Sequence, residues 1–182
     1  MRSMGKPFFR RLFSHPQEPA VDTTETRAGH GDAEAQFDLA MKFAWEGPAQ
    51  DYAQAAGWYL KAADQRHPMA QFNLGMMYST GQGVPQDAAK SLAWMQRAAN
   101  LGDAGAQYNL GMKHHRASLG GRPEAAPESR ILAYKWLRLA AAQGYRDSEA
   151  AWAFVALTMT HEDVADGGRR VAAFVPEQAY QA

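Results

Sequence analysis

The stretch AQFNLGMMYSTGQGVPQDAAKSLAWMQRAANLGD, residues 70–103, contains two motifs that also occur on either side of it. Its first motif, AQFNLGM, has copies at AQFDLAM (35–41) and AQYNLGM (106–112). Its second motif, AWMQRAA (93–99), has copies at GWYLKAA (57–63) and KWLRLAA (135–141). The first motif starts at residues 35, 70 and 106, so the period is 35 to 36 residues. A fixed period of this length is typical of proteins that stack one supersecondary unit several times.

The spacing of apolar residues predicts that each unit is a pair of helices. Gln71, Leu74, Gly75 and Tyr78 stand at positions i, i+3, i+4 and i+7, which places them on one helical face. Strict alternation of apolar and polar residues, which would indicate strands, is absent. Glycine and proline fall between the two motifs of every unit, where a turn is needed. We call the first helix of each unit helix A and the second helix B.

Small and large residues recur at fixed places in these helices. Helix A has Ala40, Gly75 or Gly111 at one position, and helix B has Trp58, Trp94 or Trp136 at another. A residue without a large side chain lets a neighbouring helix approach closely, and a tryptophan fills the space that remains. Because one helix pair cannot bury its apolar face alone, stacking the three pairs builds a continuous core. We expect the three tryptophans in that core and not on a surface that stacks on nucleic-acid bases.

Residues 70–103 resemble a Sel-one-like repeat, a relative of the tetratricopeptide repeat. The matching positions are Leu74, Gly75, Tyr78, Gly81, Gly83, Val84, Asp87, Lys90, Trp94, Arg97, Ala98, Ala99 and Gly102. The outer repeats depart from the pattern. The first has AWEGPAQDY (44–52) as its loop and Arg66 at the closing glycine, and the third has a longer loop and, we expect, His115 at the tyrosine position.

The resemblance implies an all-α fold, a right-handed α/α superhelical solenoid of three repeats with a C-terminal pair of capping helices. We place the repeats at about residues 31–67, 68–102 and 103–145, and the capping helices and tail at 146–182. Within the cap, residues 146–157 look like a further helix A. Thr160 is expected to cap a closing helix over 161–175 that Gly167–Gly168 breaks or weakens.

Residues 1–30 are predicted to be a disordered basic and polar tail. Residues 1–13 carry four basic residues and no acidic one, and the arginines at 10 and 11 interrupt the apolar residues around them. A signal peptide needs an uninterrupted apolar run, so that interpretation is the weakest. Binding of this tail to a membrane surface or a partner is the alternative to plain disorder, because cations beside phenylalanines suit an anionic interface.

Composition excludes several classes of protein. The chain has 19 Lys+Arg and 19 Asp+Glu, so it lacks the overall positive charge that favours nucleic-acid binding. It has no cysteine, which excludes disulfides and thiolate metal sites. No apolar run approaches the roughly 20 residues of a transmembrane helix. We expect a cytoplasmic protein, with membrane association or export as alternatives, and no nucleic-acid partner.

Reactive side chains that would indicate catalysis are sparse. His114 and His115 are adjacent, so on a helix they point about 100° apart and do not easily face one metal ion. Glu124 and Glu128 lie in the nearby loop and are the residues that could complete a site in three dimensions. The glycines of STGQGVPQ (79–86) lack the lysine of a phosphate-binding loop. We therefore expect no cofactor, no metal site and no catalytic residues.

Helix A carries a second apolar stripe, roughly opposite the leucine and tyrosine face. Its members recur at intervals of four and three, and those we expect to bind a partner are Phe37, Met41, Phe72, Met76, Tyr108, Met112 and His115. In tetratricopeptide-like arrays this side of helix A faces the concave groove, where methionines adapt to irregular partners. The other interpretation is that the stripe packs between successive helix pairs.

The expected function is a non-catalytic scaffold or adaptor that binds a peptide or partner protein along the helix A groove. The resemblance implies such a role but names no partner. Two alternatives come from other classes. One is a membrane-associated assembly or regulatory factor that is tethered by residues 1–13. The other is a small hydrolase, since some relatives have been described as having such activity, but those rely on disulfide-linked repeats.

Overall fold

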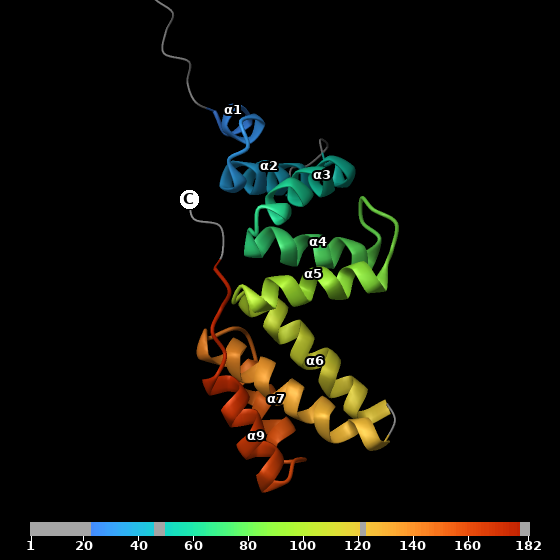
Figure 1. Ribbon diagram of the computed structural model, residues 1–182. Helices are drawn as coiled ribbons and strands as arrows, with labels where there is room; N and C mark the ends of the chain where they lie inside the picture. Colours follow the sequence, from blue (N-terminus) through green and yellow to red (C-terminus); the bar gives the residue numbers. More distant parts are fainter. Residues whose placement is uncertain (1–22, 46–49, 121–122, 179–182) are drawn as a thin grey trace, which may run out of the picture.

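The computed structural model describes residues 23–45, 50–120 and 123–178, and every regular element in these ranges is a helix (Figure 1). The elements, in chain order, are α1 Thr24–Gly29, α2 Ala33–Trp45, α3 Tyr52–Asp64, α4 Pro68–Thr80, α5 Ala88–Asn100, α6 Ala104–Gly120, the 3₁₀ turn η2 Pro123–Ala125, α7 Ala126–Ala142, α8 Ser148–Ala156 and α9 His161–Ala172. The prediction of an all-α repeat fold is confirmed for these ranges.

The helices form three hairpins that stack along the chain. Helices α2 and α3, α4 and α5, and α6 and α7 pair as helix A and helix B, and each hairpin contacts the next (Figure 1). Helices α8 and α9 both pack against α7. After α9, residues 173–178 run back along the connecting loops toward the end of α5 (Figure 1). We call residues 173–178 the C-terminal segment.

Short polar residues and left-handed turns delimit the helices. The Asp51 and Asp87 side chains accept hydrogen bonds from backbone N–H groups in the first turns of α3 and α5. Such caps satisfy N–H groups that have no partner within the helix. After helix B, the chain turns through positive φ at Arg66, Gly102 and Gly144, which have φ of 65°, 96° and 70°. These signals end each helix where the repeat pattern predicts.

The recurring small residues permit close contact between paired helices, as the sequence predicts. A Cβ atom built on Gly111 would lie 2.6 Å from Cγ of Leu137, and one built on Gly75 would lie 3.1 Å from Cγ of Met95. Trp136 is buried, whereas Trp58 and Trp94 are half-buried. Both pack against a core of the first and second hairpins that includes Tyr59 and Leu74. Lys61 and Arg97 lie over the rings of those two tryptophans.

The structure corrects the boundary of the predicted N-terminal tail. Residues 24–29, which were expected to be disordered, form α1. Thr23 caps this helix, and Ala28 is buried against α2 with its carbonyl oxygen bonded to the side-chain amide of Gln36. A polar sequence can therefore be ordered when one alanine and one carbonyl group dock onto the first hairpin. Residues 1–22, with their expected membrane or partner contacts, lie outside the described part.

The structure also corrects the expected weakness in the closing helix. Helix α9 continues through both glycines from His161 to Ala172, and Thr160 and Asp163 form the predicted capping box. A Cβ atom on Gly167 would lie 2.6 Å from Cδ1 of Tyr134. Gly167 is therefore the point at which α9 comes close to α7, and the packing compensates for the low helix propensity of glycine.

None of the helices in the described ranges combines the length and the apolar character that crossing a bilayer requires.

Candidate functional site

The aromatic members of the predicted stripe pack between hairpins. Phe37 is 5% exposed and stacks on His67 with ring centroids 4.6 Å apart. Phe72 touches the start of α6, where a Cβ on Gly105 would lie 3.1 Å from Cζ of Phe72. The ring of Tyr108 lies 5.6 Å from that of Tyr145, just before α8. Each aromatic ring thus contacts the beginning of the following unit, and Phe37 is not accessible to a partner.

The methionines of the stripe differ from one another in exposure. Met41 and Met76 are 41% and 38% exposed. Met112 is half-buried and packs against the cluster that contains Tyr134 and Leu137. Only Met41 and Met76, among the seven predicted binding residues, are therefore largely open to solvent.

A groove of about 650 Å³ opens where the second and third hairpins diverge. Its lining comes from α4, the loop before α5, α5 and α6, and comprises Met76, Ser79, Gln86, Ala88, Ser91, Leu92, Met95, Asn109, Leu110, Lys113 and Arg116. Leu92 is 37% exposed, whereas Met95 and Leu110 are buried and form an apolar floor. Lys113 and Arg116 are exposed, and the lining includes no acidic residue. The groove is therefore apolar with a positive side.

A smaller cavity of about 200 Å³ lies beside the groove, between the first and second hairpins. Its lining is Ala44, Trp45, Tyr52, Tyr59, Asn73, Met76, Met77 and Gln82. Met76 is common to both hollows, and Trp45 is 82% exposed. The two hollows therefore adjoin at Met76, and we call them together the Met76 groove.

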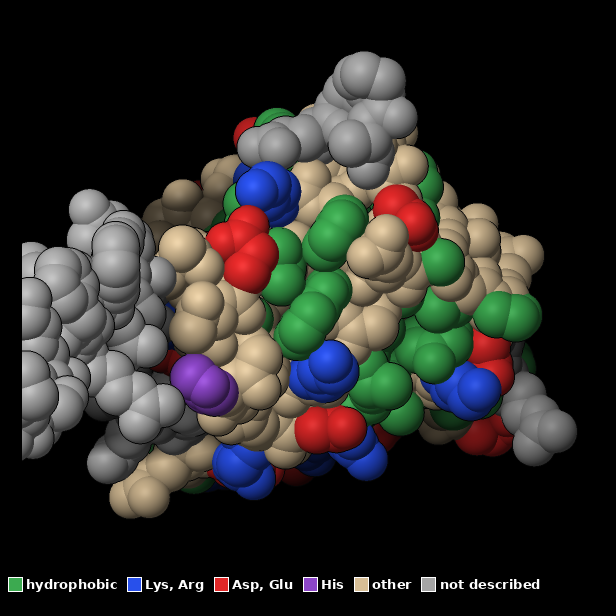
Figure 2. Space-filling view, turned by 90° about the horizontal axis from the view of Figure 1, so that it is seen from above, with side chains coloured by type: hydrophobic (Ala, Val, Ile, Leu, Met, Phe, Trp, Pro, Cys, Tyr) green, Lys and Arg blue, Asp and Glu red, His purple; other side chains and the backbone are tan. Residues whose placement is uncertain are grey.

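The first hairpin, at one end of the stack, also exposes large apolar side chains. Met41, Trp45 and Leu60, from α2 and α3, are 41%, 82% and 40% exposed. Figure 2 looks onto this end and shows apolar side chains gathered across its middle, with charged side chains around them. At this end α1 packs against α2, and at the opposite end α8 and α9 pack against α7.

Sequence reasoning missed most residues of the Met76 groove because it searched for positions that recur. Leu92 corresponds to Ala56 and Tyr134 in the other repeats, and Arg116 corresponds to Trp45 and Thr80. Neither position keeps its character from one repeat to the next. The groove is thus built from residues that differ between repeats, and such residues are passed over when only the positions shared by all three repeats are considered.

The two adjacent histidines, His114 and His115, have different surroundings in the structure. Tyr78 comes three residues after Gly75, and His114 comes three residues after the equivalent Gly111. The tyrosine position of the third repeat is therefore His114, and its assignment to His115 is wrong. His115 packs edge-on against Phe154, with ring centroids 5.9 Å apart. Burial and the neighbouring Lys113 lower the pKa of His114.

Of the two acids near the histidines, one is paired with an arginine and the other is exposed. Glu128 accepts two hydrogen bonds from Arg170, at 2.6 and 3.0 Å, and Glu124 is exposed. Within the described ranges no three His, Asp or Glu side chains converge as metal ligands would.

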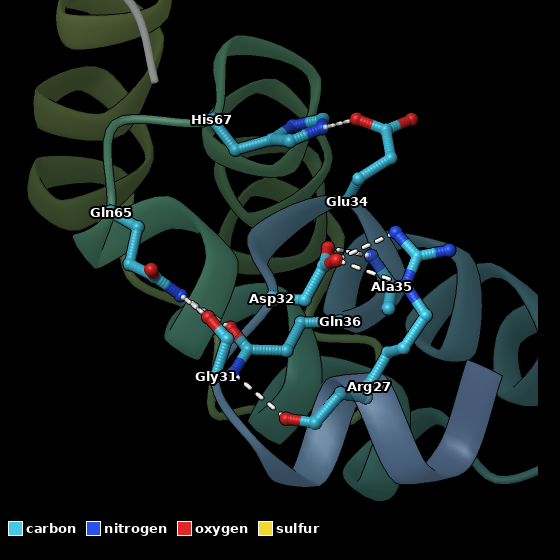
Figure 3. A network of polar contacts seen from close by, with 9 residues as sticks. Arg27, Gly31, Asp32, Glu34, Ala35, Gln36, Gln65 and His67 are labelled. Atoms are coloured by element: carbon cyan, nitrogen blue, oxygen red, sulfur yellow. Dashed lines mark hydrogen bonds and ion pairs between the residues drawn. The ribbon is translucent and has the colours of Figure 1, made fainter. Parts of the chain in front are cut away.

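Side-chain amides close the open end of the first hairpin (Figure 3). Gln65, which follows α3, donates to the carbonyl oxygen of Gly31 at 2.9 Å and to Oε1 of Gln36 at 2.8 Å. Gln36 donates in turn to the carbonyl oxygen of Ala28 at 3.1 Å. Asp32 accepts from the backbone N–H of Ala35 and pairs with Arg27. Every buried polar atom of Gln36 thus has a partner.

His67 occupies the capping position of α4, which corresponds to Asp32 before α2. Its Nδ1 accepts a hydrogen bond from the backbone N–H of Ala70, and its Nε2 lies 3.0 Å from a carboxylate oxygen of Glu34 (Figure 3). An Nδ1 that accepts carries no proton, so Nε2 donates to Glu34. This contact joins the first hairpin to the second.

Comparison with known proteins identifies the repeats. The family model described as Sel1 repeat matches residues 33–67, 68–103 and 104–145. A sequence comparison with curated proteins finds no match.

Two solved structures are similar to the chain. A Sel1 repeat protein from Oxalobacter formigenes superposes with a TM-score of 0.60 at 34% identity, over 71% of this chain and 93% of that one. The protein c5321 is described as a protective antigen present in uropathogenic Escherichia coli strains that displays an SLR fold. It superposes with a TM-score of 0.60 at 30% identity, over 82% of this chain and 32% of that one. This chain therefore spans about a third of c5321.

Proposed function

The chain belongs to the Sel1 repeat family, whose repeats generally mediate protein interactions and are typically non-catalytic, and we propose that it is a non-catalytic scaffold that binds a partner protein in the Met76 groove. The observation that carries this proposal is the pair of adjoining hollows that share the exposed Met76. Ligand sites in proteins are usually concave and apolar, with few polar groups that fix orientation.

The lining of the groove defines the partner's chemistry. Met76, Leu92 and the floor at Met95 favour apolar side chains, and methionine adapts its shape to irregular partners. Lys113 and Arg116 favour a carboxylate on one side of the groove, because the lining has no acid to neutralise them. An amphipathic helix or peptide with acidic residues along one edge meets both requirements.

The test compares full-length protein with two variants as bait for proteins from the native host. Met76→Glu and Leu92→Glu each place a carboxylate in the groove at an exposed position. Leu157→Glu is the matched control, because Leu157 is 86% exposed and does not line the groove. A partner found in this way is purified and titrated against all four proteins.

We expect the groove variants to bind the purified partner at least tenfold more weakly, because a carboxylate in the groove opposes apolar contact and repels the acidic edge of the partner. The Leu157→Glu protein should bind as the wild type does, and circular dichroism should show the same helix content in all four. Equal affinity of the Met76→Glu and wild-type proteins for the partner would refute the assignment of binding to this groove.

A further inference from the structure

The amide bridge that closes the first hairpin recurs in the third but not in the second. Gln143 donates to the carbonyl oxygen of Gly102 at 3.0 Å and to Oε1 of Gln107 at 3.0 Å, as Gln65 does to Gly31 and Gln36. The corresponding residue of the second hairpin is Leu101, which has no side-chain donor. The second hairpin therefore lacks the group that joins its two ends.

The missing donor leaves a buried acceptor unpaired. Gln71 is 4% exposed, and its Nε2 donates to the carbonyl oxygen of Ala63 at 2.9 Å. Its Oε1 has no donor anywhere in the described ranges. A cavity of about 300 Å³ opens at this place, lined by Ala63, Asp64, Arg66, Gln71, Arg97, Leu101 and Glu177. A buried acceptor without a partner is costly, so this cavity favours a group that donates an N–H. We call it the Gln71 socket.

The C-terminal segment crosses the mouth of the Gln71 socket. The backbone N–H of Glu177 donates to the carbonyl oxygen of Asn100 at 2.9 Å, and Arg66 donates to the Glu177 carboxylate at 2.8 Å and to the carbonyl oxygen of Gln178 at 2.9 Å. Phe174 packs edge-on against Trp136, with ring centroids 5.7 Å apart. An extended peptide is thus already seated here by an aromatic anchor, a backbone bond and a carboxylate.

Arg66 stands where the equivalent loops have glycine. Gly31 and Gly102 have φ of 97° and 96°, and Arg66 adopts φ of 65°, a conformation that strains a side-chain-bearing residue. The backbone at this turn thus favours glycine, whereas the bonds to Glu177 and Gln178 need a guanidinium group. The strain is offset by contacts that lie outside the repeat.

We propose that the Gln71 socket is a second peptide-binding site, which the C-terminal segment occupies in cis and which an extended, carboxylate-bearing segment of a partner protein takes by displacing it. When Glu177 leaves, Arg66 and Arg97 face Asp64, so the socket carries a net positive charge. Arg97 lies over the ring of Trp94 and has no carboxylate partner within the described residues. The incoming peptide supplies a carboxylate to the arginines and an N–H to Gln71.

The experiment measures binding of a labelled synthetic peptide, AFVPEQAYQA (residues 173–182), to full-length proteins by fluorescence anisotropy. Glu177→Lys releases the resident segment without changing the arginines of the socket. Adding Arg66→Ala removes the carboxylate partner. Leu101→Gln supplies the amide that Gln65 and Gln143 provide in the other hairpins. Arg169→Ala, at an exposed arginine on α9, is the matched control.

We expect the Glu177→Lys protein to bind the peptide about tenfold more tightly than the wild type, because the resident segment no longer competes. Arg66→Ala should abolish this gain, and Arg169→Ala should not change it. Leu101→Gln should also leave it unchanged with this peptide, because the resident segment gives Oε1 of Gln71 no donor in the structure. If the Glu177→Lys protein is misfolded by circular dichroism, Glu177→Gln replaces it with the same expected order.

Equal binding by the wild-type and Glu177→Lys proteins would overturn the proposal, as would a gain that survives Arg66→Ala. A dimer that forms as protein concentration rises would also overturn it, because the second occupant would then be another copy of the same segment. Met76→Glu should leave peptide binding unchanged, so failure of this proposal and failure of the Met76 groove are separate results.

Discussion

Single side chains adapt a common repeat to its position in the stack. His114 stands where the second repeat has Tyr78, and its side chain is half-buried. Gln65 and Gln143 close the first and third hairpins, while Leu101 leaves the ends of the second hairpin open. These differences leave the backbone path unchanged but determine which polar atoms are paired. Two predictions concern such residues.

The first prediction is a pH dependence that His114 causes. Burial and Lys113 lower the pKa of His114 below its usual 6.5, so the unfolded chain takes up a proton at a higher pH than the folded one. The free energy of unfolding therefore rises with pH through the window below 6.5 and levels off above it.

Urea denaturation between about pH 5 and about pH 7 measures this dependence. We expect the rise in unfolding free energy to be smaller in His114→Gln than in the wild type, while His161→Gln, at an exposed position, retains it. An identical pH profile in His114→Gln and wild type would contradict the prediction.

The second prediction concerns the amide bridge of the third hairpin. Gln143→Ala leaves Oε1 of Gln107 without its donor, and Gln107 is 1% exposed. We expect a loss of about 1–3 kcal/mol in the free energy of unfolding, because a buried acceptor loses its only partner. Urea denaturation checks this value, and Gln82→Ala, at an exposed glutamine, should stay within about 0.5 kcal/mol of the wild type.

At the scale of the helix, two glycines of similar helical setting have opposite roles. Gly111 faces Leu137 at a distance that admits no Cβ, whereas a Cβ on Gly57 in α3 would meet no atom within 4 Å. The equivalents of Gly57 are Ala93 and Lys135, so its position tolerates side chains elsewhere in the chain.

We therefore expect Gly111→Ala to destabilise the protein by about 1–3 kcal/mol through overpacking between α6 and α7. Gly57→Ala should stabilise it by about 0.5–1 kcal/mol, because alanine favours the helix without a clash. Thermal and urea denaturation of the two variants side by side provide the measurement. A Gly111→Ala protein as stable as Gly57→Ala would show that Leu137 moves aside at little cost.

The helices themselves are the part of this molecule that the sequence predicts best. Periodicity at Gln71, Leu74, Gly75 and Tyr78 and the breakers between motifs suffice, because both signals are local. Helix α1 was missed because its order depends on a contact with Gln36 that no local pattern contains. Continuity of α9 through Gly167 was missed for the same reason, since Tyr134 lies far away in the sequence.

The candidate sites were harder to predict from the sequence than the fold was. The sequence left open whether the stripe that contains Met76 faces a partner or packs between hairpins; in the structure Met76 is exposed, whereas Phe37 of the same stripe is buried. Phe37 turned out to be core because His67 stacks on it, and this requires knowing how the second hairpin docks. The Gln71 socket exists because Leu101 replaces the glutamine found in the other hairpins and because the C-terminal segment packs at its mouth. Neither feature is visible in a local pattern.

At the scale of the whole molecule, stability depends on contacts between neighbouring hairpins. Arrays of this kind behave as a line of units, each of which is coupled only to the next. Phe72 is the aromatic contact from α4 to the start of α6, so it couples the second hairpin to the third. Met76, on the same helix, faces the Met76 groove instead.

We expect Phe72→Ala to lower the free energy of unfolding by about 2 kcal/mol, since a half-buried phenylalanine is truncated to leave a cavity. The coupling should weaken too, so that amide hydrogen exchange in α2–α5 and α6–α9 no longer reports a single opening event. Met76→Ala should change stability by less than about 0.5 kcal/mol. If both variants were equally stable, Phe72 would not be an inter-hairpin contact of consequence.

The polar residues at the hairpin ends also distinguish one hairpin from another. All three hairpins bury the same leucines, alanines and small residues, so apolar packing alone would allow a hairpin to dock on the wrong neighbour or on another molecule's hairpin. The capping residue is aspartate at positions 32 and 103 but histidine at position 67, and only the histidine can donate to Glu34 of the first hairpin. A stack in which the second hairpin docked on the wrong neighbour, or on another molecule, would lose this hydrogen bond.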